Sequence, residues 1–288
     1  MLAWYYFVLI SSVLMGISTI IEKNTLKNEH AAAYSAAFTI IILPLSLIFL
    51  PFANFHITLY EVAIIYAVSL ISTSTYVLSA RAYRHGNISI TSPLLSSLPV
   101  MFTVLFAFLF IEERLSFIQY ASIAVLIISS YFMVFDTGKN VQNGYKRGKY
   151  VAILLLDSVL MAAGTVIMKY LFDLNVNIFT YLILVEYFIA LNMVLVMLFR
   201  YGGLGEIAAN IKRYKVPILA IAVLTTLYRV TYYLAAAPAA IGLVYTLRNS
   251  VYVLITVAIG GILFSEKKLA FKTILSAIII VAAYALIS

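Results

Sequence analysis

The feature that most constrains this chain is a series of ten apolar runs, each close to the length that an α-helix needs to cross a lipid bilayer. About 30 Å of hydrocarbon requires roughly 20 helical residues. The runs are continuous and lack the strict alternation of a transmembrane β-barrel, so they predict helices. We place them at Leu2 to Ile21, Ala31 to Leu50, Leu59 to Ala82, Ser89 to Ile111, Phe117 to Phe135, Tyr150 to Phe172, Ile178 to Phe199, Val216 to Ala236, Ile241 to Phe264 and Leu269 to Ile287.

The composition agrees with a chain that lies mostly in a membrane. Hydrophobic residues make up 64% of the 288 residues and charged residues only 10%, well below the roughly 25% of soluble domains. The first run has no basic segment before it and no small-residue cleavage site, so we expect a retained span. We therefore predict an all-α integral membrane protein with ten transmembrane helices, located as a multi-pass protein in the cell membrane.

Several chemistries find no support in the sequence. The chain has no cysteine and only three scattered histidines, so we expect no metal site. It lacks a Walker sequence and a Ser-His-Asp set, which argues against ATP hydrolysis and against an enzyme, and we expect no cofactor. The net charge of +8 comes from short connections between the runs and not from one soluble face, so we expect no nucleic-acid partner.

The basic residues divide unequally between the two sides of the predicted bundle. Fifteen lie at odd-numbered connections, whereas two, Arg114 and Lys169, lie at even-numbered ones. The positive-inside rule places the side with fifteen in the cytoplasm. Both termini are then expected on the outer side of the membrane.

Two pairs of similar segments indicate an internal repeat. The segment from Ser12 to Lys23, SVLMGISTIIEK, agrees with Ser158 to Lys169, SVLMAAGTVIMK, at seven of twelve positions. Later, FIEERLSF at Phe110 to Phe117 recurs as FSEKKLAF at Phe264 to Phe271. The offset grows from 146 to 154 residues because the connection after the seventh run is longer than the one after the second.

The repeat divides the chain into two copies of five helices. We predict a first five-helix repeat at residues 1–135, a polar linker at 136–149 and a second repeat at 150–288. Because five is odd, the second copy must cross the membrane in the opposite direction. Two such inverted repeats are typical of secondary transporters, in which substrate binds between the halves.

The chain resembles the EamA-like branch of the drug/metabolite transporter superfamily over its whole length. The resemblance is most specific from Ala80 to Phe132, where a short turn, a serine-rich helix containing Pro99 and an apolar helix ending at Glu112 follow one another. It implies a ten-helix carrier of small organic solutes, with a central cavity lined mainly by the first four helices of each half. Members of this family usually have cytoplasmic termini. The resemblance thus predicts both termini inside the cell, whereas the distribution of basic residues predicts both outside.

Four charged residues fall inside predicted spans, where each costs at least about 2.5 kcal/mol and rarely faces lipid. They are Asp157, Glu186, Arg229 and Arg248, and all lie in the second repeat. Acidic residues within spans commonly carry protons in transporters. We therefore predict that Asp157 and Glu186 couple transport to protons, with facilitated exchange as the alternative.

Each of the two arginines shares a helical face with tyrosines, because residues at i, i+3, i+4 and i+7 lie on one side of a helix. An arginine fork binds carboxylates, and tyrosine offers an apolar ring with a hydroxyl group. The spacing predicts a site for an organic anion or zwitterion, with buried arginine–carboxylate pairs that hold the helices together as the alternative. The predicted binding residues are Tyr228, Arg229 and Tyr232 in the eighth run, Tyr245, Arg248, Asn249 and Tyr252 in the ninth, and Tyr76, Ser96 and Ser11 on the opposite wall.

We therefore predict a secondary transporter that moves a small organic metabolite, such as an amino acid or another carboxylate-bearing solute, across the cytoplasmic membrane by alternating access. Its expected partners are that solute, the lipid bilayer and protons, and a single chain is expected to suffice. The alternatives are a channel or facilitator for small solutes and a multidrug exporter of organic cations.

Overall fold

The computed structural model describes residues 3–26, 31–85, 88–135, 147–201 and 203–263, together with Ile278 and Ala282. Within these residues the chain is all-helical, as the sequence predicts, and nine of the ten predicted runs form helices. The tenth run, Leu269 to Ile287, lies outside the described residues apart from Ile278 and Ala282.

The described helices follow the predicted order in both halves of the chain. Six of them are long and apolar enough to cross a membrane, namely α1, α2 with its 3₁₀ extension η1, α3, α6, α7 and α9. The apolar stretches of α4, α5 and α10 are shorter over the residues searched. The bounds are α1 (Trp4–Leu26), α2 (Ala31–Ser46), η1 (Leu47–Phe52), α3 (Leu59–His85), α4 (Ile88–Phe110), α5 (Phe117–Phe135), α6 (Arg147–Asp173), α7 (Ile178–Arg200), α8 (Gly205–Arg213), α9 (Lys215–Ala236) and α10 (Ile241–Leu263).

Two features of these helices differ from the sequence prediction. Helix α1 continues five residues past the predicted end at Ile21, so that Glu22 and Lys23 are helical. Lys23 is buried, with 7% of its surface exposed, because α1 turns this face toward the protein. The long connection before α9 contains a short helix, α8, whose buried Ile207 and exposed Lys212 give it one apolar and one polar face.

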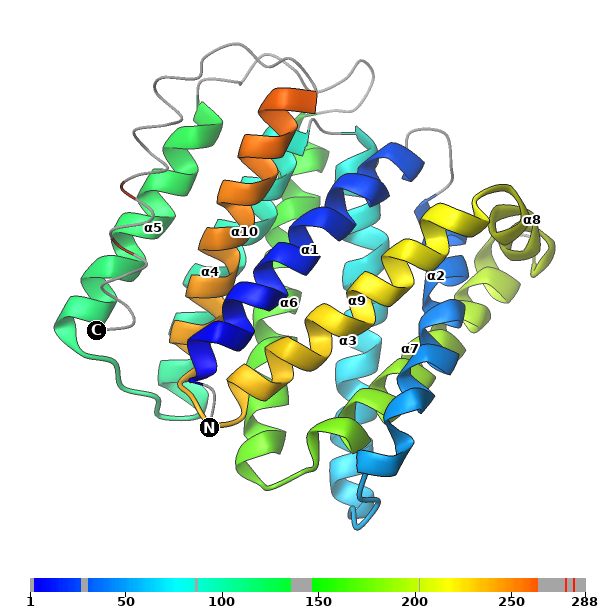
Figure 1. Ribbon diagram of the computed structural model, residues 1–288, viewed down its shortest axis with the longest axis horizontal. Coiled ribbons are helices and arrows are strands. Elements are labelled where there is room, and N and C mark those ends of the chain that lie inside the picture. The colour runs from blue at the N-terminus through cyan, green and yellow to red at the C-terminus, as the bar shows by residue number, and fades with distance from the viewer. Residues whose placement is uncertain are drawn as a thin grey trace.

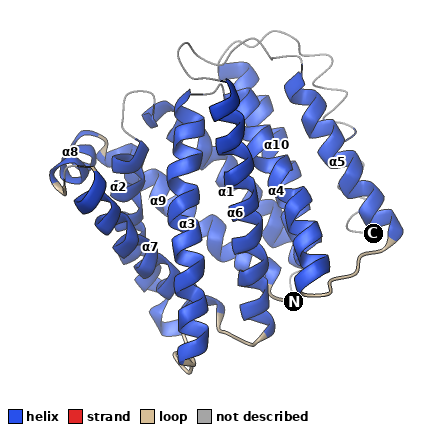
Figure 2. Cartoon of the chain, turned by 180° about the vertical axis from the view of Figure 1, so that it is seen from behind, coloured by secondary structure: helices blue, strands red, loops and turns tan. Residues whose placement is uncertain are grey.

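The helix packing is unchanged when α1, α2, α3 and α4 are exchanged with α6, α7, α9 and α10. Helix α1 packs on α9 and α10, and in the same way α6 packs on α3 and α4. Helix α2 packs on α9 as α7 packs on α3, while α2 meets α7 and α4 meets α10. Figures 1 and 2 show these neighbours from the two sides of the molecule, with α5 at one edge and α8 at the other.

A pair of lysine contacts follows the same exchange of halves. The ammonium group of Lys23 in α1 donates to the backbone carbonyl of Tyr83 near the end of α3. Lys169 in α6 donates to the carbonyl of Ala237, just past the end of α9, at 3.0 Å. The lysines differ by 146 residues and the carbonyls by 154, which are the two offsets of the sequence repeat. The same contact is therefore made at equivalent places in both halves.

The corner between α4 and α5 is tied to the start of α10. Glu112 adopts a left-handed backbone conformation (φ 54°) that ends α4 and turns the chain. The carboxylate of the next residue, Glu113, accepts hydrogen bonds from the backbone N–H groups of Ile241 and Gly242, both at 2.7 Å. Partial burial raises the pKa of Glu113 above its ordinary value, although these two donors act in the opposite direction. An acidic group at a helix N-terminus also complements the helix dipole, so Glu113 fixes α10 relative to α4.

Candidate functional site

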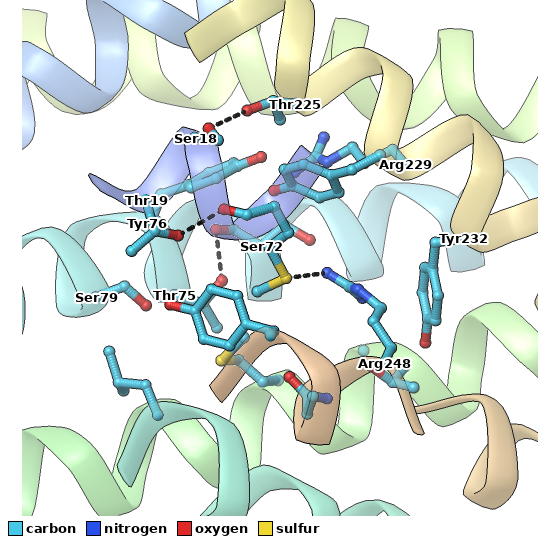
Figure 3. Close-up of a pocket in the computed structure, with 18 of the residues that line it drawn as sticks. Ser18, Thr19, Ser72, Thr75, Tyr76, Ser79, Thr225, Arg229, Tyr232 and Arg248 are labelled. Atoms are coloured by element: carbon cyan, nitrogen blue, oxygen red, sulfur yellow. Dashed lines mark hydrogen bonds between the residues drawn. The ribbon is translucent and has the colours of Figure 1, made fainter. Parts of the chain in front are cut away.

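A polar cavity of about 210 Å³ lies inside the helix bundle. Its walls come from eight helices, α1 to α4 in the first half and α6, α7, α9 and α10 in the second. These are the first four predicted spans of each half, as the family resemblance implies. Figure 3 shows serine, threonine, tyrosine and arginine side chains from several of these helices around the cavity.

The repeated segment of α1 and α6 lines the cavity with the same positions in both copies. In each copy the lining positions follow the i, i+3, i+4, i+7 spacing of a single helical face. They are Met15, Ser18, Thr19 and Glu22 in α1 and, 146 residues later, Met161, Gly164, Thr165 and Met168 in α6. The repeat that is visible in the sequence is thus a repeat of cavity walls, and its one acidic residue, Glu22, corresponds to Met168 in the other copy.

Nine of the ten predicted binding residues line this cavity. The exception is Ser11, whose hydroxyl group donates to the backbone carbonyl of Tyr228 at 2.8 Å. Ser11 therefore ties α1 to α9 and does not belong to the wall. The nine residues that the structure brings together are Arg229, Arg248, Tyr228, Tyr232, Tyr245, Asn249, Tyr252, Tyr76 and Ser96.

Arg229 forms an ion pair with Glu186. Its guanidinium contacts the carboxylate of Glu186 in α7, a residue with no exposed surface. The guanidinium also lies 5.3 Å from the centre of the Tyr76 ring, within the range of a cation–π contact. The alternative that the sequence leaves open, a buried arginine–carboxylate pair between helices, is thus realised for Arg229.

Arg248 has a different environment, although it also lies at the cavity wall with 7% of its surface exposed. Its guanidinium lies 4.2 Å from the centre of the Tyr232 ring and 5.4 Å from that of Tyr228. The hydrogen bond that it donates goes to the sulfur of Met15 at 2.9 Å, as Figure 3 shows, and a thioether is a weak acceptor. Among the described residues no carboxylate pairs with it, and its Nε atom has no hydrogen-bond partner.

The other polar residues of the wall are held by local contacts. Tyr252 and Tyr83 share a hydrogen bond between their hydroxyl groups at 2.9 Å, and the Asn249 amide donates to the carbonyl of Tyr245 at 2.8 Å. The hydroxyl group of Tyr76 is buried and has no hydrogen-bond partner within the described part of the chain. These side chains offer a substrate a polar surface with fixed positions.

The two predicted coupling acids lie behind the cavity wall. Asp157 in α6 is fully buried and accepts a hydrogen bond from Ser79, a wall residue in α3, at 2.5 Å. Glu186 is held by Arg229 as described above. The Ser79 hydroxyl group thus lies between Asp157 and the cavity, whereas the Arg229 side chain lies between Glu186 and the cavity.

Several wall residues were not predicted from the sequence. Glu22 was missed because hydropathy ended the first run at Ile21, the residue directly before it. The helical spacing inside the repeated segment could have indicated Ser18 and Thr19. Helix α3 contributes a further polar stripe of Ser72, Thr75 and Ser79, which is visible in Figure 3.

The fold and the cavity define a class, a multi-helix membrane protein with a polar site at the junction of its two halves. Comparison with known protein families supports this class. Residues 2–135 match the EamA-like transporter family. The chain therefore contains an EamA-like transporter domain of the drug/metabolite transporter superfamily, which makes the protein a multi-pass membrane transporter and not an enzyme.

A solved crystal structure shares the fold across nearly the whole chain. It aligns with a TM-score of 0.72 over 98% of this chain and 96% of the other, at 13% sequence identity. At this identity the similarity concerns the fold alone. A comparison with curated protein sequences gave no match.

The two arginines should differ sharply when each is replaced. Removing one member of the Arg229–Glu186 pair strands a buried charge, which typically costs about 3–5 kcal/mol, so Glu186→Gln and Arg229→Met should lower the melting temperature in detergent. Arg248→Gln leaves no carboxylate stranded and should retain a melting temperature close to that of the unaltered protein. A loss of stability in Arg248→Gln as large as in Arg229→Met would contradict the assignment of different roles.

Proposed function

We propose that the protein is a secondary transporter whose central cavity binds a small organic solute through a carboxylate group. The observation that carries this proposal is Arg248, a guanidinium at the cavity wall that no described carboxylate neutralises. A charged group in a membrane interior is costly unless it is paired. A substrate carboxylate would supply the missing partner, since the guanidinium fork can form two parallel hydrogen bonds with it.

The size and the charge of the cavity favour a small anionic or zwitterionic solute over an organic-cation drug. About 210 Å³ is below the roughly 300–1,000 Å³ of pockets that hold drug-sized ligands. Arg248 would attract a carboxylate, which an organic-cation drug lacks. These features support a metabolite of amino-acid size, and they disfavour the multidrug alternative.

We further propose that the two halves form an inverted repeat and that access to the cavity alternates between them. The exchangeable helix packing and the matched lysine contacts support this proposal. Lys23 lies in the last turn of α1, and Lys169 lies four residues before the end of α6. Figure 1 shows that these two helix ends lie at opposite ends of the bundle. Each lysine joins two helices of its own half, so the pair would close the two ends of the cavity.

Transport through a binding site should saturate and should show counterflow. In liposomes loaded with one carboxylate-bearing solute, external uptake of a labelled solute should rise transiently above its equilibrium level. A panel of amino acids, organic acids, nucleosides and cationic dyes would identify the class. Linear flux without counterflow, together with single-channel currents, would favour the channel alternative instead.

The lysine contacts make a prediction about access, and the absence of cysteine in the chain allows it to be measured with one introduced thiol. In a Ser72→Cys background, Lys23→Met should increase labelling of the cavity by an impermeant maleimide from the Lys23 side only. Lys169→Met should increase labelling from the opposite side only. Lys212→Met, on the exposed face of α8, is the control. Labelling from both sides in each variant would contradict alternating access.

Proton coupling is proposed for Asp157 in preference to Glu186, because Glu186 already pairs with Arg229. One oxygen of Asp157 accepts from Ser79, and the other has no partner among the described residues. Asp157→Asn should abolish accumulation driven by a pH gradient and should spare exchange at equal concentrations. Glu206→Gln on the exposed face of α8 is the control. Unchanged accumulation in both Asp157→Asn and Glu186→Gln would leave facilitated exchange as the mechanism.

A further inference from the structure

Glu22 is an acidic residue that lines the cavity and has no part in the carboxylate site proposed above. It belongs to the stripe of α1 that faces the cavity, two helical turns beyond Met15. Among the described residues, no hydrogen bond or ion pair reaches its carboxylate. The other two acids near the cavity lie behind its wall, where Asp157 accepts from Ser79 with one oxygen and Glu186 pairs with Arg229. Glu22 is thus an acidic counterpart of the unpaired Arg248.

Glu22 and Arg248, which lack an ionic partner within the described part of the chain, line the same cavity from two helices, α1 and α10. Arg248 donates to Met15, which marks its level on α1. Seven residues separate Met15 from Glu22, or about 10 Å along the helix at 1.5 Å per residue. Tyr228 lines the same cavity, and the centre of its ring lies 5.4 Å from the Arg248 guanidinium. A small zwitterion would span this separation if it formed one charge-assisted hydrogen bond of about 2.8 Å with Arg248 and another with Glu22.

The internal repeat shows that the scaffold does not need an acid at this position. The residue equivalent to Glu22 in α6 is Met168, which lines the cavity in the same way. A methionine therefore satisfies the packing of this face. A carboxylate that is unpaired at a membrane-embedded wall carries a cost, and in such a place an ionisable residue indicates a role in function.

We propose that Glu22 binds the cationic group of the substrate and that the site recognises a zwitterion, with the ammonium group at Glu22 and the carboxylate at Arg248. The proposal rests on the proposed function, in which Arg248 binds the carboxylate. Arg229 pairs with Glu186, and Asp157 lies behind the wall, so the charged side chains that line the cavity without a described ionic partner are one positive and one negative. A solute with one charge of each sign and no net charge complements them.

The test compares leucine, phenylalanine and alanine with their deaminated acids (isocaproate, phenylpropionate and propionate) and their decarboxylated amines. Binding to the purified full-length protein is measured from the rise of the melting temperature with ligand concentration, which yields an apparent Kd. The variants are Glu22→Gln and Glu22→Met, the second of which copies the residue of the other repeat, and Arg248→Gln.

For at least one of these amino acids, the unaltered protein should bind the zwitterion more tightly than either analogue. Both Glu22 variants should weaken binding of that amino acid at least about tenfold and leave binding of its deaminated acid within about twofold. Arg248→Gln should weaken both. Unchanged affinity for the amino acid in Glu22→Gln, with a loss only of pH-driven accumulation, would overturn the proposal and assign Glu22 to proton coupling.

Equal weakening of the amino acid and its deaminated acid in the Glu22 variants would also overturn the proposal, since it would show a general effect on the cavity. Failure of the proposed function has a different signature. In that case none of the deaminated acids would bind the unaltered protein or either of its Glu22 variants. Glu22→Asp, which keeps the charge, should restore part of the selectivity for the zwitterion if the other variants fold poorly.

Discussion

The constraint on which the proposed mechanism depends is the guanidinium of Arg248, which lies inside a membrane-embedded bundle and has no counter-charge among the residues that the structure describes. The surroundings of Arg248 are two tyrosine rings and a thioether, which contribute cation–π attraction and a weak hydrogen bond. Neither removes the net charge. The nearby Arg229 shows how the fold neutralises an arginine when the role is structural, since it pairs with Glu186, a residue with no exposed surface. The contrast between the two arginines is what separates scaffold from site.

The bundle combines a repeated scaffold with charges that are not repeated. The same four positions of α1 and α6 line the cavity, and the same lysine contact recurs near the end of each helix. By contrast, both arginines, Asp157 and Glu186 stand in the second half and Glu22 in the first. We infer that the repeated part serves the change of access, because both ends of the cavity must close by the same packing. The unrepeated charges then give the cavity its preference for one solute class.

Much of this arrangement could be predicted from the sequence because hydropathy and helical spacing are local properties. The spacing in the eighth and ninth runs placed Tyr228, Arg229 and Arg248 on faces that do meet at the cavity. Helix packing decides which residue of a neighbouring helix each arginine contacts. The pairing of Arg229 with Glu186 therefore could not be predicted from the sequence of either helix alone. The same limit applies to Ser11, which contacts a backbone carbonyl. Hydropathy alone also ended the first run before Glu22. A charged residue lowers the mean hydropathy of a segment even where its side chain faces the protein interior.

The pairing of Arg248 with a substrate carboxylate can be measured by removing each partner in turn. The protein and its Arg248→Gln variant would each be titrated with a substrate and with the corresponding amide, in which the carboxylate is neutral and nearly unchanged in shape. We expect the unaltered protein to bind the acid at least about tenfold more tightly than the amide, or about 1.4 kcal/mol. This preference should disappear in Arg248→Gln. A preference of the same size in both proteins would show that the carboxylate is bound elsewhere and would contradict the assignment of Arg248.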